Sequence, residues 1–209
     1  GGYLLVEVEA RAGHAKEAKA MADRLEQHFG STDLVLAAEA RAADASGADP
    51  WPIWQKGYQQ FPSSQILLQM AGELLITHPQ GMPEEATHLL IQNGTWSDNY
   101  NIAVNRHNAQ DFAGCVSVLA PILDTAPADA ATSIRALAYI CAAQADDLEM
   151  LDKLYQEGAG LEPMAVVRHA WLLAEAGRKT EASAMLPLVC TDANPDVAHN
   201  CSLVKAKIK

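Results

Sequence analysis

The chain has 209 residues, of which 49% are hydrophobic, and a formal net charge of −11 at pH 7. This acidic balance argues against a nucleic-acid-binding protein and against a protein that docks on an anionic membrane, because both need clustered Lys and Arg. No run of about 18 apolar residues is present, which argues against a transmembrane helix in this sequence.

Segments of helical periodicity follow one another along the chain, separated by short breaks. Between the breaks apolar residues recur three and four positions apart, as one buried helix face requires, and the strict alternation of a half-buried strand is missing. We therefore expect an all-α protein, with one domain over residues 1–209. The expected helix pairs span residues 1–30, 31–62, 63–94, 97–127, 130–160 and 162–194, and a closing helix spans 195–209.

A common frame appears when the first helices of these pairs are aligned. An opening residue, usually apolar, is followed four positions later by an alanine, as in Leu67-x2-Met70-Ala71 and Ile134-x2-Leu137-Ala138. The small residue lets two helices cross closely, and larger residues fill the space to the next pair. The frame starts recur at a spacing of about 32 to 35 residues, at Leu34, Leu67, Asn99, Ile134 and Val166.

This frame resembles the tetratricopeptide repeat family, whose unit is about 34 residues long. The resemblance implies a right-handed α-solenoid of antiparallel helix hairpins, somewhat irregular, with a C-terminal capping helix whose polar outer face keeps the array soluble. Three departures are visible. His169 is polar within the frame, His78 to Pro83 makes a long turn, and Pro50 and Pro52 predict a late, short helix in the second pair.

In that family the first helices line a concave groove that holds a peptide or protein segment. The resemblance assigns to this groove Tyr100, His107, Asn108, Arg135, Tyr139, Trp171 and Glu175. The same slots also contain Gln65, Leu68, Leu75, Thr132, Met164 and Val167. Tyr, Trp and Arg are frequent hot spots of binding, but Trp171 and Tyr139 could equally fill space between repeats. The aromatic group of Trp51, Trp54, Tyr58 and Phe61 is interpreted as a local core.

Four cysteines lie in the second half of the sequence, and none belongs to a CxxC motif. Buried free thiols in helix packing are the first interpretation. The alternative is disulfide bonding, because Cys115 and Cys141, and likewise Cys190 and Cys201, fall on neighbouring expected helices. Disulfides would imply an oxidising compartment.

No catalytic motif is recognisable, and the seven histidines show no metal-ligand spacing. We therefore expect no enzyme, metal or cofactor. The carboxylate pairs fall at turns or helix starts, which is a structural placement. Asn93-Gly94 is expected to end a helix, with Gly94 in the left-handed conformation.

The function expected from the sequence is a scaffold that binds another protein or peptide segment. The alternative is a structural spacer module of a larger, membrane-anchored or exported polypeptide, and a small-molecule-binding or enzymatic α-protein is a third hypothesis. The chain starts Gly1-Gly2 without Met, which suggests processing or truncation. Together with the cysteine pairs, this favours an exported, periplasmic bacterial protein over a cytoplasmic one.

Overall fold

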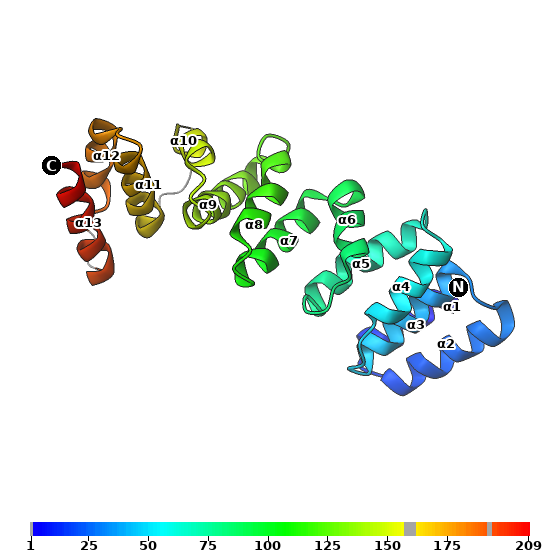
Figure 1. Ribbon diagram of the computed structural model, residues 1–209. Coiled ribbons are helices and arrows are strands. Elements are labelled where there is room, and N and C mark those ends of the chain that lie inside the picture. Colours follow the sequence, from blue (N-terminus) through cyan, green and yellow to red (C-terminus); the bar gives the residue numbers. More distant parts are fainter. Residues whose placement is uncertain (1, 157–161, 192–193) are drawn as a thin grey trace. The chain divides into compact units, whose positions relative to one another are not determined.

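A computed structural model describes residues 2–156, 162–191 and 194–209, and every regular element within these ranges is a helix (Figure 1). The all-α class expected from the sequence is thereby confirmed. No helix in the described ranges is long and apolar enough to cross a bilayer.

The helices group into two compact units, and the boundary falls between Asn101 and Ile102, within α7 (Trp96–Asn108). The single domain expected from the sequence stays a prediction. The first unit contains α1 (Gly2–Arg11), α2 (Ala15–Phe29), α3 (Asp33–Ala45), α4 (Trp51–Gln60), α5 (Gln65–Thr77) and α6 (Glu84–Asn93). The second contains α8 (Phe112–Leu119), α9 (Ala128–Gln144), α10 (Leu148–Gln156), α11 (Pro163–Glu175), α12 (Lys179–Met185) and α13 (Pro195–Ile208). Short 3-10 turns follow α8 at Ala120–Ile122 and α12 at Leu186–Leu188.

Helix packing follows chain order within each unit. In the first unit α1 packs against α2 and α3, and α3 packs against α4 and α5. In the second unit α9 packs against α10 and α11, and α11 packs against α12 and α13. Each of these first helices therefore contacts its own partner helix and the first helix that follows, which is a repeat-like arrangement.

The alanines of the aligned frame all lie in the core. All five are 0–1% exposed: Ala38, Ala71, Ala103, Ala138 and Ala170. Four of the residues that open the frame are buried as well, but Leu34 is 50% exposed. The first residue of the frame is thus not a core position in every copy.

Two tryptophans hold the irregular second pair in place. α4 begins at Trp51, directly after Pro50, and Pro52 lies in its first turn, where a missing N–H costs nothing. Trp54 is fully buried and its Nε1 donates to the Leu67 carbonyl at 2.8 Å, while Trp51 Nε1 donates to the His78 carbonyl at 2.9 Å. Both indoles therefore belong to the core and tie α4 to α5 and its C-terminal turn.

Gly94 ends α6, but the expected left-handed conformation is wrong, because its φ is −78°. A glycine is needed here for space. A Cβ at this position would lie 2.5 Å from the Leu90 carbonyl oxygen and 3.0 Å from Asp98 Oδ2. The Asp98 carboxylate approaches this closely because it accepts hydrogen bonds from the Thr95 N–H and hydroxyl at 2.7 and 2.8 Å.

All four cysteines are paired in the second unit. Cys115 of α8 is bonded to Cys141 of α9, and Cys190 is bonded to Cys201 of α13. The structure therefore has disulfides where buried free thiols were the first interpretation. Each bond joins consecutive helical segments, so the loop between them is closed covalently.

Candidate functional site

A shallow depression of about 260 Å³ opens on the second unit between α9, α11 and α13. Its floor is apolar, since Val167 and Val204 are both buried. Polar side chains stand at its edge. The lining residues are Gln144, Met164, Val167, Arg168, Trp171, Asn200, Leu203 and Val204.

The α11 wall results from two stripes of side chains on one helix. Pro163 is in the first turn, and the Glu162 carboxylate caps the helix by accepting from the Ala165 N–H at 2.7 Å. Val166, Ala170 and Leu173 form the stripe that packs inside. Met164, Val167 and Trp171 are spaced three and four residues apart on the stripe toward the depression, as helical periodicity requires.

The α13 wall is fixed at its start and in its middle. The Asn194 side chain caps the helix by accepting from the Asp196 N–H at 2.9 Å. The Cys190–Cys201 bond then joins the helix to the turn after α12. Asn200, Leu203 and Val204 line the depression from this helix, and Leu203 is 45% exposed. Its large apolar side chain is thus exposed to solvent on a helix that a disulfide fixes in place.

Trp171 has a cation over its ring. The Lys207 ammonium lies 4.1 Å from the ring centroid and donates to Glu175 Oε1 at 2.9 Å. The hydrogen bond from Lys207 lowers the pKa of the Glu175 carboxyl below its ordinary value. The charges of Lys207 and Glu175 beside the depression therefore balance one another.

Arg168 is balanced in the same way. Its Nε and Nη2 donate to Asp146 at 2.8 and 2.6 Å, and Nη2 also reaches the second carboxylate oxygen at 2.7 Å. Such a forked pair fixes the guanidinium plane. Asp146 has a φ of +58° in the turn between α9 and α10, a conformation that aspartate tolerates better than most residues.

The structure brings together only part of the groove set predicted from the sequence. Trp171, Met164 and Val167 line the same depression. Glu175 does not line it, but it is bonded to Lys207, whose ammonium lies over the Trp171 ring. Arg135 is half-buried on α9 and does not line it. The sequence prediction missed Arg168 of α11 and Leu203 and Lys207 of α13. The spacing of Asn200, Leu203 and Lys207 on one helix face could have indicated the two α13 residues.

Other predicted groove residues lie elsewhere. Tyr139 is 0% exposed, so its assignment to the groove is wrong. His107 packs its ring edge-on against Phe112 at 5.7 Å, beside the exposed Asn108 at the end of α7. Tyr100 is half-buried on α7 in the first unit.

Tyr139 belongs to a buried polar network. Its hydroxyl lies 3.0 Å from His169 Nδ1, and His169 Nε2 lies 3.0 Å from Asp152 Oδ1. Asp152 in turn accepts from Arg178. Burial lowers the pKa of His169, so the neutral ring accepts from the tyrosine hydroxyl and donates to the carboxylate. Burial alone would raise the pKa of Asp152, but hydrogen bonds from Arg178 and His169 outweigh it and lower that pKa.

The first unit has a depression of its own, of about 480 Å³, along α5 and the start of α7. Gln65 and Leu68 line it, as two of the predicted groove positions, together with the exposed Ile76. Leu75, a third predicted groove position, is buried and belongs to the core. Asp98 approaches Gly72 so closely that a Cβ there would lie 2.7 Å from Oδ1.

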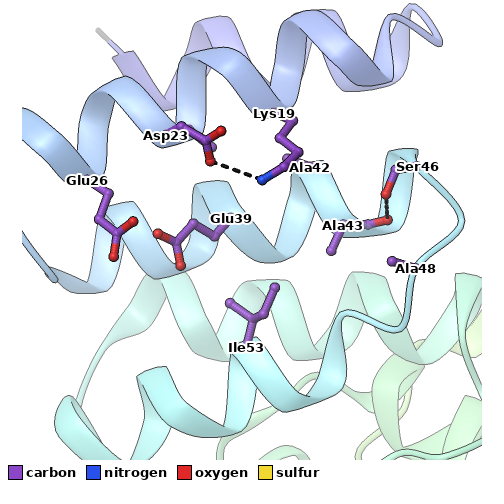
Figure 2. A pocket seen from close by; sticks show the side chains of 10 residues that line it. Lys19, Asp23, Glu26, Glu39, Ala42, Ala43, Ser46, Ala48 and Ile53 are labelled. Carbon is purple, nitrogen blue, oxygen red and sulfur yellow. Dashed lines mark hydrogen bonds and ion pairs between the residues drawn. The ribbon is translucent and has the colours of Figure 1, made fainter.

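A second depression of the first unit, of about 360 Å³, lies between α2, α3 and α4. Figure 2 shows the Glu26 and Glu39 carboxylates facing one another there, with Lys19 donating to Asp23 at 3.1 Å. Burial raises the pKa of Glu39, and the neighbouring Glu26 raises it further. Within the described residues, no three His, Cys, Asp or Glu side chains gather as a metal site would require.

Comparisons with models of protein families, with curated proteins and with solved structures find no match for this chain.

Proposed function

We propose that this chain is a tetratricopeptide-like scaffold that binds a segment of another polypeptide, and that the depression between α9, α11 and α13 is the contact site. The observation that carries the proposal is the half-exposed Trp171 beside the exposed Leu203 over an apolar floor. Tryptophan and leucine here offer a large apolar contact area, and tryptophan is the residue most enriched among binding hot spots.

The rigidity of α11 and α13, the two helices that flank the depression, supports this role. Both α11 and α13 begin at a capping side chain, and α13 is held by a disulfide, so the contact residues stand on rigid elements. A site that is rigid before binding loses less conformational entropy when a partner docks. The asparagine and glutamine amides at the edge can hydrogen-bond to the backbone of an extended segment.

The burial of the acid–base side chains favours a scaffold over an enzyme. Tyr139, His169 and Asp152 resemble the components of a proton relay, but the first two are buried and engaged with one another. A substrate could not reach them without opening the unit. We therefore assign the network a structural role.

Selection of peptides from a random displayed library tests the proposal. Sequences enriched on the native chain should lose binding to the double variant Trp171→Ala, Leu203→Ala, because it removes the two exposed apolar side chains of the depression. A matched control is Leu188→Ala, which removes an exposed leucine outside it. Circular dichroism and thermal melting should be nearly unchanged in both variants. Absence of any enriched sequence would contradict the proposal and favour the spacer module.

A further inference from the structure

The ammonium of Lys207 shows what kind of group the Trp171 side of the groove accepts. It lies over the indole ring at 4.1 Å from the centroid and bonds to Glu175 Oε1 at 2.9 Å. A ring face attracts a cation through its quadrupole, and a carboxylate next to it adds a charge-assisted hydrogen bond. The protein thus contains, from its own last helix, a cation in a two-sided subsite.

This internal cation is exchangeable. Lys207 lies in the last turn of α13, and the side chains of Lys207 and Glu175 are 30% and 48% exposed. Cation–π contacts and ion pairs at such exposed positions are weak, and a lysine held in one rotamer loses much side-chain entropy. An incoming cation that is already positioned by neighbouring contacts can therefore replace Lys207.

Charge complementarity indicates the partner. The chain contains 26 acidic and 15 basic residues, so its field attracts positive segments. The two cations at the depression are each paired with a carboxylate, Arg168 with Asp146 and Lys207 with Glu175. An acidic segment would have to displace one of these carboxylates and would do so against the net charge.

We propose that the Trp171 ring and the Glu175 carboxylate form a subsite for a lysine side chain of the bound polypeptide, and that Lys207 fills this subsite in the unbound protein. The proposal rests on the proposed function and names its partner class, a basic segment with apolar residues beside the lysine. The apolar residues would occupy the adjacent floor, between Met164 and Leu203. Release of Lys207 is then part of binding.

The test uses two capped pentapeptides that each carry two leucines, followed by lysine in one and by norleucine in the other. Binding is followed by nuclear magnetic resonance, through the indole N–H signal of Trp171 in isotope-labelled protein. Lys207→Met removes the competing ammonium and keeps the stem. If Lys207 fills the subsite about four-fifths of the time, its removal should tighten binding of the lysine peptide by about fivefold.

Three comparisons make the result specific. Lys205→Met, which removes the same charge from an exposed position on the same helix, should leave the affinity for the lysine peptide nearly unchanged. Made together with Lys207→Met, so that no competing ammonium is present, Glu175→Gln should weaken the affinity for the lysine peptide about two- to fivefold, the usual range for an exposed ion pair. Affinity for the norleucine peptide should be the same in the native chain and in Lys207→Met. A second variant, Lys207→Gln, repeats the test if the methionine lowers the melting temperature.

The outcomes separate the two proposals. Equal binding of both peptides in every variant would overturn the lysine subsite and leave the groove intact. An equal gain in Lys207→Met and Lys205→Met would show a general charge effect and would also overturn it. Absence of binding by either peptide to any variant would contradict the groove itself, and the lysine subsite with it.

Discussion

The two units are stabilised by different kinds of interaction. The second unit contains all four cysteines, in two disulfides, and the buried network of Tyr139, His169 and Asp152. The first unit contains no cysteine. It buries Trp51 and Trp54 instead, each with its indole N–H on a backbone carbonyl.

This difference means that the two units should respond differently to the same change in conditions. A disulfide depends on the redox state of the solution, and a buried histidine depends on pH. Buried indoles depend on neither. Reduction should therefore act on the second unit, which also contains the candidate groove. Mild acid should destabilise the same unit, whereas the raised pKa of Glu39 means that protonation favours the folded form of the first unit. The first unit should respond most strongly to changes in packing.

The largest effect expected of a single substitution is that of Trp54→Ala on the first unit. Trp54 is fully buried, stacks on Tyr58 at 5.2 Å and bonds to the Leu67 carbonyl. Removing a buried indole costs about 3–5 kcal/mol, and the carbonyl also loses its partner. Hydrogen exchange read by mass spectrometry should show lost protection in α3, α4 and α5.

Trp96→Ala is the matched control, because Trp96 is 37% exposed. It should change the free energy of unfolding by less than about 1 kcal/mol, as surface substitutions usually do. Equal loss of protection in α9 and α11 of the Trp54 variant would break the comparison, since the two units would then unfold together.

Reduction should destabilise the second unit selectively. Closing a loop between cysteines 26 residues apart, as in Cys115–Cys141, removes unfolded-chain entropy worth about 3.5 kcal/mol. The Cys190–Cys201 separation of 11 residues corresponds to about 3 kcal/mol in the same model. Thermal melting with and without reductant should show a lower transition for α8 to α13 only.

Replacing each pair separately locates the effect. The double variant Cys190→Ala, Cys201→Ala should loosen α13. It should also lower the affinity of the groove for a peptide, because Leu203 and Lys207 belong to that helix. Cys115→Ala with Cys141→Ala should lower stability and leave the α11–α13 wall in place. The first unit has no cysteine, so reductant should leave its melting temperature unchanged. Earlier melting of the first unit in reductant would contradict the selective effect on the second unit.

Mild acid should act on the second unit through His169. Burial lowers the pKa of His169 below its ordinary value of 6.5, with Arg178 acting in the same direction. The folded unit therefore binds fewer protons than the unfolded chain below that pH. Its free energy of unfolding should fall as pH drops through about 6.5 toward the folded pKa. Asp152, whose pKa is also lowered, keeps its contribution until the pH falls below its ordinary value of 3.8.

His169→Gln tests this sign. A glutamine can donate to Asp152 and accept from Tyr139 but does not titrate, so the loss of stability between pH 6.5 and 5 should become smaller in urea unfolding curves read at the second unit. His199→Gln, at an exposed position of the same unit, is the matched control. An unchanged pH dependence in His169→Gln would show that other groups are responsible.

The sequence was sufficient for the helices and for the buried alanines of the frame but not for the side-chain partners. Ala71 and Ala138 could be placed from spacing alone, because a period of one repeat sets which residues cross. His169 stood out as a polar residue in an apolar frame. Its partners Tyr139 and Asp152 come from two other helices, and only packing brings them to the ring.

The groove shows the same limit. The stripe of Met164, Val167 and Trp171 follows from helical periodicity, so the sequence could predict it. The opposite wall depends on how α13 lies against α11, a tertiary contact that no local pattern encodes. For the same reason Tyr139, which occupies a first-helix slot, is buried instead of facing a partner.

The smallest expected effect concerns one exposed polar contact at a helix end of the first unit. Thr95 and Asp98 bond reciprocally at the start of α7: the Asp98 N–H donates to Thr95 Oγ1 at 3.2 Å, and the Thr95 N–H donates to Asp98 Oδ2 at 2.7 Å. Thr95→Ala removes one half of this capping box and should cost about 1 kcal/mol. Ser97→Ala, in the same turn but outside the box, should cost less. Urea unfolding of the first unit measures the change in free energy of unfolding for both variants. Equal losses would mean that the capping box adds little stability beyond that of any polar side chain in this turn. A loss confined to Thr95→Ala would show that the first unit, too, depends on a specific polar contact, but on an exposed one that reduction of the disulfides does not disturb.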